Sequence, residues 1–280
     1  HAGGVATKVV TMQRMWQTIR WLASTLWPLY TVAILGSNIV AALGIILFLK
    51  FLVPLPSSSL FAPSSNLSTI AIVYMCIATV VCAVVIFILF RPVLDWQRRP
   101  EKHDPNMVRN LVMRIPFYQM LVALVVWIIG IAIVTFIAAQ TSLRLASIIG
   151  IAATLTGLVV VMLTYLEAER LLRPLAAAAL ARRFEDSILE PPVSLRLRVT
   201  WIMTSAVPVF GILLLLIGHR SGYIPGLLVQ LVPAMVALCV AALITGFLGT
   251  ALLVMSVSDP ILELRAAINQ ARRGELDVEV

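Results

Sequence analysis

The sequence predicts an all-α membrane protein with six transmembrane helices. Apolar residues make up 61% of the 280 residues and charged residues only 12%, whereas soluble domains carry about 25% charged residues. The charges are also clustered, which leaves six uncharged stretches that can each hold the ~20 apolar residues of a membrane-crossing helix. The alternating strands of a membrane barrel are absent, so helices are the expected spanning structure. We expect the spans near 28–50, 67–90, 116–139, 145–166, 200–218 and 227–256.

Residues 1–27, before the first span, are predicted to form a cytoplasmic or interfacial amphipathic helix. Lys8, Arg14 and Arg20 occur there among Val, Met, Ile, Leu and Trp, a composition typical of helices that lie at the membrane surface. A helical extension of the first span fits the same residues equally well. Residues 28–256 then form the six-helix transmembrane domain.

The basic residues predict the orientation. With six spans, all but three of the 21 Lys and Arg fall on one side of the membrane. Because cytoplasmic loops carry an excess of Lys and Arg, both termini are expected in the cytoplasm of a multi-pass protein of the bacterial plasma membrane. The same bias accounts for the net charge of +8, so nucleic-acid binding is not expected.

A proline repeat predicts the pairing of the helices. Spans two, four and six each leave the membrane through a proline followed by an aliphatic residue, at Pro92, Pro174 and Pro260. This repeat indicates three helical hairpins, each with a cytoplasmic helical extension.

Four residues at the outer ends of the spans are candidates for ligand binding: Lys50, Arg144, His219 and Arg220. One interpretation is that these side chains snorkel to the lipid headgroups. The other is a basic ring that binds a carboxylate or phosphate, such as that of a lipid-like ligand whose tail enters between the helices. The external loops are too short for a folded sensor domain, so the helices, the lipid or this rim must detect any stimulus.

The spans contain polar residues of a mild kind only. They lack the mid-membrane ionisable residues that transporters use, and their Ser, Asn and Thr side chains favour helix–helix contacts over an ion path. These are Ser37, Asn38, Thr135, Thr154, Thr156 and Thr245. Two prolines, Pro208 and Pro233, are expected to kink spans five and six. Glu167 and Glu169, which follow span four, are interpreted as part of a solvated helix face with pairs along the helix.

The chain offers no residues for catalysis. It has no Gly-rich phosphate loop, no paired His for a metal, and no Ser–His or Cys–His arrangement. All three cysteines fall inside predicted spans, where apolar packing is their expected role. We therefore assign no catalytic, cofactor or metal residue.

The segment after span six has the pattern of a coiled coil. Pro260 is suited to the first turn of a helix, and Gly274 to its end. So short a helix is not stable alone in water, so its apolar seam needs partners. The seam residues, at spacings of three, four and three, are Ile261, Leu264, Ile268 and Ala271.

Residues 257–280 resemble the first half of a HAMP linker. The matching features are the membrane exit at Asp259-Pro260, the aliphatic seam, and Gly274-Glu275-Leu276 at the start of the connector. In that family, two chains each supply two helices to a parallel four-helix bundle that relays movement from the membrane to an output domain. The second helix and the output domain are expected beyond Val280. The relay residues that the resemblance implies are Asp259, Pro260, Ile261, Leu264, Ile268, Ala271, Gly274, Glu275 and Leu276.

The whole chain looks like the membrane region of the mycobacterial-type class III adenylyl cyclases. The resemblance rests on six spans, short external loops, a basic N-terminal segment and a HAMP-like linker. It implies a membrane anchor and a sensing module that responds to membrane lipids or an anionic small molecule. It also implies a homodimer through span six and the HAMP helix. A C-terminal cyclase domain would then convert ATP to cyclic AMP and pyrophosphate with Mg or Mn.

Two other functions remain open. The chain is also compatible with the sensor half of a HAMP-linked histidine kinase or chemoreceptor, which the residues after Val280 would distinguish. A transporter is a third alternative, against which the uncharged spans argue.

Overall fold

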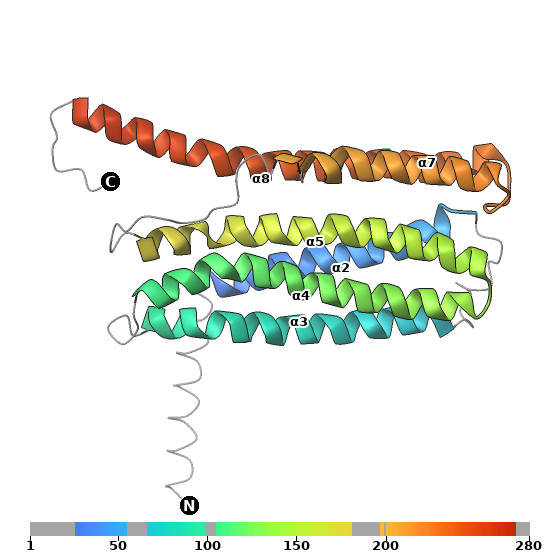
Figure 1. The fold of residues 1–280 in the computed structure, drawn as a ribbon, viewed down its shortest axis with the longest axis horizontal. Helices are drawn as coiled ribbons and strands as arrows, with labels where there is room; N and C mark the ends of the chain where they lie inside the picture. The colour runs from blue at the N-terminus through green and yellow to red at the C-terminus, as the bar shows by residue number, and fades with distance from the viewer. Residues whose placement is uncertain (1–25, 55–65, 99–104, 181–196, 199, 273–280) are drawn as a thin grey trace, which may run out of the picture.

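The computed structural model describes residues 26–54, 66–98, 105–180, 197–198 and 200–272 (Figure 1). No strand occurs in this part of the chain, and six of its helices are long and apolar enough to cross a membrane. The prediction of an all-helical, multi-pass membrane protein is confirmed, whereas the orientation of the termini stays a prediction. The helices are α2 (Trp27–Phe51), α3 (Asn66–Arg98), α4 (Pro105–Ala139), α5 (Leu143–Leu180), α7 (Val207–Arg220) and α8 (Val232–Arg272). A π-helical turn, η3 (Ile202–Ala206), precedes α7, and a 3-10 turn, η4 (Leu228–Leu231), precedes α8.

The helices form a group of four, α2–α5, with the α7–α8 hairpin laid along α5 (Figure 1). Helices α4 and α5 pack most extensively because only a tight turn at 140–142 joins them. Helix α2 packs mainly on α5, and α3 packs mainly on α4. Helices α2 and α3 contact each other less.

The two ends of the protein differ. At one end, which we call the rim end, α2 ends at Phe51, the 140–142 turn joins α4 to α5, and a loop joins α7 to η4. At the other end, which we call the extension end, α3, α5 and α8 end at Arg98, Leu180 and Arg272. Helix α8 runs past the ends of α3 and α5 there (Figure 1).

Two apolar cores hold the helices together. The core nearer the extension end joins α2–α5, and no described side chain of the hairpin belongs to it: Tyr30, Ile34, Ile86, Phe90, Val93, Leu94, Trp96, Val112, Ile115, Ala168 and Leu172. The core at the rim end also includes the hairpin: Leu49, Val53, Leu67, Ala138, Leu145, Ala146, Ile149, Leu215, Ile224, Leu231 and Ala234. The hairpin is therefore anchored to the four-helix group mainly at the rim end.

The prolines lie in different places from those expected. Pro260 does not start a new helix, because α8 is unbroken from Val232 to Arg272. An interior proline removes one hydrogen bond and bends the axis, and α8 bends away from α5 over its extension (Figure 1). Pro233 lies in the first turn of α8, where it breaks no interior bond, so the predicted kink within span six is wrong. Pro208 follows the π-helical turn at the start of α7, so span five departs from regular helix just before it.

Candidate functional site

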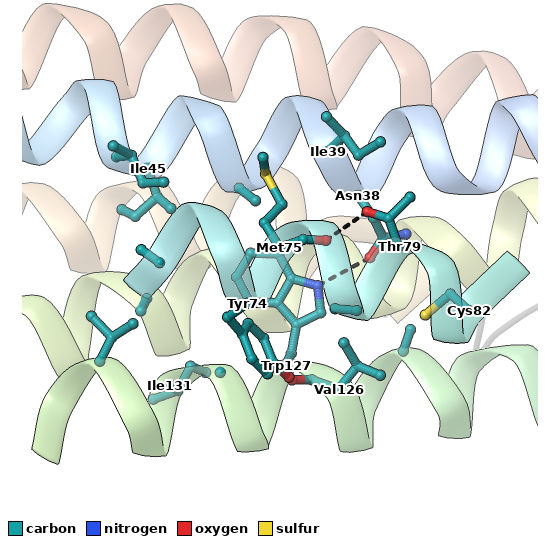
Figure 2. A pocket seen from close by; sticks show the side chains of 18 of the residues that line it. Asn38, Ile39, Ile45, Tyr74, Met75, Thr79, Cys82, Val126, Trp127 and Ile131 are labelled. Atoms are coloured by element: carbon teal, nitrogen blue, oxygen red, sulfur yellow. Dashed lines mark hydrogen bonds between the residues drawn. The ribbon is translucent and has the colours of Figure 1, made fainter. Parts of the chain in front are cut away.

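An apolar cavity of about 150 Å³ lies within the four-helix group (Figure 2). Along α3 its lining runs from Leu67 to Cys82, a distance of about 22 Å at 1.5 Å per residue. The cavity is therefore long and narrow, parallel to the helices. Its lining from α2 and α3 is Ile34, Leu35, Asn38, Ile39, Ala42, Ile45, Ile46, Leu49, Leu67, Ser68, Ala71, Tyr74, Met75, Ala78, Thr79 and Cys82. From α4 and α5 it is Gln119, Ala123, Val126, Trp127, Gly130, Ile131, Val134, Ile149 and Ala153.

Small residues and one aromatic ring shape the cavity. Ala42, Ala78 and Ala123 leave room between the helices. Tyr74 crosses from α3 to α4, where its hydroxyl donates to the carbonyl of Val126 at 2.5 Å. Its ring rests on Gly130, at which an added methyl would lie 2.7 Å from the ring Cε1. Glycine at 130 therefore permits the ring position that narrows the cavity.

Asn38 connects three helices at the cavity wall, and Figure 2 shows its bond to Trp127. Its Nδ2 donates to Thr164 Oγ1 of α5 at 3.1 Å and to its own-helix Ile34 carbonyl at 2.8 Å. Its Oδ1 accepts from Trp127 Nε1 of α4 at 3.0 Å. The expectation that Asn38 serves helix–helix contact is confirmed. Bonds of this kind between membrane helices average ~0.6 kcal/mol and reach ~1.7 kcal/mol.

Ser37, the residue before Asn38 on α2, donates to Glu167 Oε2 of α5 at 2.8 Å. Glu167 is partly buried and lies inside the candidate span Leu143–Leu172. The interpretation of Glu167 as part of a solvated face is therefore wrong: its carboxylate turns toward α2 and pairs across helices. Ionisable side chains in membrane spans are costly and commonly functional. The polar pair Ser37-Asn38 in an otherwise apolar span was the signal that a partner lay opposite.

Gln119 is the most unusual polar residue of the cavity. Its side chain is 1% exposed, and its Oε1 has no hydrogen-bond partner among the described residues. A buried, unpaired amide oxygen costs free energy. Gln119 thus offers an acceptor beside an otherwise apolar volume, an arrangement typical of ligand pockets.

The four predicted rim residues all lie at the rim end, in two places. Arg144, in the first turn of α5, contacts the loop after α7: its guanidinium bonds to the Gly222 carbonyl at 3.5 Å and lies 5.6 Å from the Tyr223 ring centre. His219 and Arg220 form the end of α7. Lys50 lies on the last turn of α2, with Nζ 5.4 Å from the ring centre of Phe51. The structure thus brings Arg144 beside the α7 end, and anion binding at this rim stays a prediction.

The predicted relay residues divide between two regions. Asp259, Pro260 and the seam residues lie on α8. Gly274, Glu275 and Leu276 lie outside the described residues, as does the predicted N-terminal helix up to residue 25. Within the described residues, no group of three or more His, Cys, Asp or Glu could hold a metal ion.

Together these features define a multi-pass helical membrane protein with a long intramembrane cavity. No protein-family model matches the chain, and no solved structure matches it. It is similar to proteins from Mycobacterium tuberculosis strain H37Rv and Mycobacterium bovis, each described as uncharacterized. Each is 29% identical over 254 residues, which cover 88% of this chain and 46% of the relative. A second uncharacterized protein of the same M. tuberculosis strain is 31% identical over 125 residues, covering 45% of this chain and 23% of the relative. The chain thus spans about half the length of the first relatives, 46% in each case.

Proposed function

We propose that this chain is the membrane anchor, dimerisation and sensing module of a larger signalling protein. In this proposal a HAMP linker carries the signal to an adenylyl cyclase domain, which makes cyclic AMP and pyrophosphate from ATP with Mg or Mn. The observation that carries the proposal is the single helix α8. Its 41 residues span about 62 Å, roughly twice the ~30 Å hydrocarbon thickness of a bilayer. A movement of its membrane half is thereby transmitted along the same helix to whatever follows.

The lengths of the mycobacterial relatives support the proposal that the full-length protein has a further domain. In the two mycobacterial proteins that match most of this chain, the matched part is 46% of the whole. More than half of each relative therefore lies outside the region of similarity. The choice of a cyclase as the output rests on the resemblance of the membrane region described above.

The cavity is the proposed binding site for the molecule that the module senses. Its length and apolar lining suit one hydrocarbon chain of a lipid-like molecule, and the unpaired Gln119 oxygen suits a hydroxyl donor on it. At the rim end, Leu49 lines the cavity and Lys50 follows it. A headgroup bound at Lys50 would then lie at the same end of α2 as this part of the cavity.

The core at the rim end would provide the route from the cavity to α8. Ile149 both lines the cavity and belongs to the core at the rim end, which also contains Leu231 and Ala234. A ligand that moves α2 against α5 would therefore displace the start of α8. The same route would serve a HAMP-linked histidine kinase or chemoreceptor, which is the alternative output.

The test is an assay of cyclic AMP formation by the full-length protein in membranes, with ATP and Mg or Mn. We expect cyclic AMP, and a several-fold change in rate when four residues are inserted into α8 next to Asp259. A seven-residue insertion preserves the heptad phase and should leave the rate nearer that of the unmodified protein. No cyclic AMP with either metal would refute the cyclase, and autophosphorylation from ATP would then establish the kinase alternative.

The rim is tested in the same assay by vesicle composition. The unmodified protein is compared in phosphatidylcholine vesicles with and without phosphatidylglycerol. The expected result is a change in rate with the anionic lipid that is lost in the triple variant Lys50→Gln, Arg144→Gln, Arg220→Gln. An undiminished response in that variant excludes these residues as the anion site.

A further inference from the structure

The cavity in the four-helix group is polar at one end and apolar at the other. The end nearer the extension end, which we call the polar end, is lined by Asn38, Thr79, Cys82 and Gln119. In Figure 2 the labelled members of this group lie on the opposite side of Tyr74 from Ile45 and Ile131. Toward the rim end the lining is apolar except for Ser68. An amphiphile matches this arrangement with its polar group at the polar end.

Most polar groups at the polar end already have partners. The Asn38 amide bonds to α4 and α5 through both its oxygen and its nitrogen. The Thr79 hydroxyl donates to the carbonyl of Met75 at 2.7 Å. Gln119 Oε1, on a side chain that is 1% exposed, has no partner among the described residues. The open position at the polar end is therefore an acceptor, and the group that fills it must donate a hydrogen bond.

The donor must also be uncharged. None of the residues that line the cavity is Lys, Arg, His, Asp or Glu, so an ionised group would be buried without a counter-charge at a large cost in free energy. This argument excludes an ammonium group. A carboxylate is excluded for a second reason, because it only accepts hydrogen bonds. A hydroxyl group donates one bond without charge, so it satisfies Gln119.

The polar end and the basic rim are separate places. Along α4, Gln119 lies about 22 Å from Val134, the α4 lining residue nearest the rim end, at 1.5 Å per residue. Lys50 lies at the rim end, so an anion there and a hydroxyl at Gln119 are different polar groups. The volume of about 150 Å³ is small for so long a cavity. It suits one unbranched chain rather than the two chains of a phospholipid.

We infer that the cavity binds a neutral single-chain alcohol, with the hydroxyl on Gln119 Oε1 and the chain directed toward the rim end. Gln119 lies in the half of the span Asn110–Ala139 nearer the extension end. The bound molecule would thus have the orientation of an amphiphile in the leaflet on that side. The inference deepens the proposed function, and rests on it only in taking the cavity as the sensing site.

Photoaffinity labelling of the full-length protein in phosphatidylcholine vesicles tests the inference. The probe is a decanol that carries a diazirine in mid-chain and a terminal alkyne. The comparison probe is the decanoic acid with the same chain, and unlabelled 1-decanol is the competitor. Mass spectrometry identifies the labelled peptides. We expect the alcohol to label residues that line the cavity several-fold more than the acid does, and 1-decanol to suppress this label.

Two pairs of variants separate binding from folding. Gln119→Leu removes the acceptor at similar volume, and Gln140→Leu makes the same change at an exposed position outside the cavity. Ala42→Phe fills the cavity from α2, whereas Ala41→Phe changes a neighbour that does not line it. The midpoint of thermal unfolding in detergent reports the folding of each variant. Gln119→Leu should not lower this midpoint, because it removes a buried oxygen without a partner.

We expect labelling by the alcohol to fall about fivefold in Gln119→Leu, the ratio that corresponds to one neutral hydrogen bond. It should be lost in Ala42→Phe and unchanged in both controls. Equal labelling by the acid, or undiminished labelling of a folded Gln119→Leu, would overturn the inference. Cyclic AMP formation is measured on the same vesicles. The expected labelling without cyclic AMP refutes the proposed cyclase alone, and cyclic AMP without this labelling pattern refutes the alcohol site alone.

Discussion

The four-helix group has side-chain hydrogen bonds between its helices in addition to those within them, whereas the threonine bonds of the α7–α8 hairpin stay within their own helices. In the four-helix group, Asn38 and Ser37 of α2 bond to residues of other helices. In the hairpin, Thr204 and Thr245 bond to carbonyls four residues back on their own helices. The first region is cross-linked by hydrogen bonds, whereas small-residue packing and the core at the rim end hold the second.

This difference indicates separate roles. The four-helix group lines the cavity and resists separation of its helices, because the bonds between helices must break first. No described residue of the hairpin belongs to the core nearer the extension end. Fewer described apolar contacts therefore hold the hairpin to the group there, which is compatible with the proposed relay through α8.

The largest expected effect is the difference in free energy of unfolding between alanine substitutions at two tryptophans, Trp127 and Trp201. Trp127→Ala removes a bond to Asn38 and a ring packed between α4 and its neighbours, so we expect a loss of about 3 kcal/mol in the free energy of unfolding. Trp201→Ala is the control, because that ring is 64% exposed beside the hairpin and should cost under ~1 kcal/mol. Unfolding in mixed detergent micelles measures both. Equal losses in the free energy of unfolding would contradict the view that bonds between helices stabilise the four-helix group more than the hairpin.

A smaller effect is expected for the polar bridge. Asn38→Leu leaves Trp127 Nε1 and Thr164 Oγ1 without their bonds to α2, and should cost about 1–2 kcal/mol. Thr245→Val, which removes a bond within one helix, should be nearly neutral. The midpoint of thermal unfolding in detergent compares the two. If Asn38→Leu is as stable as Thr245→Val, the hydrogen bonds of Asn38 between helices do not contribute to stability.

Packing in the hairpin gives the next prediction. At Gly249 an added methyl lies 3.1 Å from Thr200 Cγ2, whereas at Gly246 it lies 3.7 Å from the nearest atom, an ordinary contact. We expect Gly249→Ala to lower the free energy of unfolding by about 1 kcal/mol through overpacking. Gly246→Ala should leave it unchanged. The reverse order of stability would mean that α7 and α8 approach each other elsewhere.

The smallest effect concerns Glu167. Glu167→Gln keeps an acceptor for the Ser37 hydroxyl, so the free energy of unfolding should change by under ~0.5 kcal/mol, whereas Glu167→Leu should lose about 1 kcal/mol with the bond. Both variants are compared by thermal unfolding at one pH. If Glu167→Gln is as damaging as Glu167→Leu, the charge rather than the hydrogen bond holds α2 to α5.

The sequence was sufficient to predict the helices. Uncharged apolar stretches of membrane length leave one spanning structure, and the structure has candidate spans at all six places. The role of Asn38 was also predictable, because a carboxamide in an apolar span needs a partner. Which side chain it meets was not, since Thr164 and Trp127 are over 80 residues away along the chain.

The cavity and the position of Glu167 could not be predicted from periodicity. The cavity depends on how far α2 and α3 diverge, and on a tyrosine ring placed over Gly130. Glu167 precedes an arginine by three residues, a spacing that equally suits a pair on a solvated helix. The sequence alone does not show that Pro260 lies inside a longer helix, because a proline in the first turn of a helix and an interior proline have the same local pattern.

The anchoring of the hairpin at one end makes α8 a lever. From Val232 to Arg272 the axis measures about 60 Å, so a tilt of about 5° at the rim end displaces the far end by roughly 5 Å. The far end of α8 would therefore move by about the pitch of one helical turn after only a small rearrangement around Leu231 and Ala234. If α8 acts as the proposed relay, the size of the signal depends on the length of α8 more than on the size of the change at the rim end.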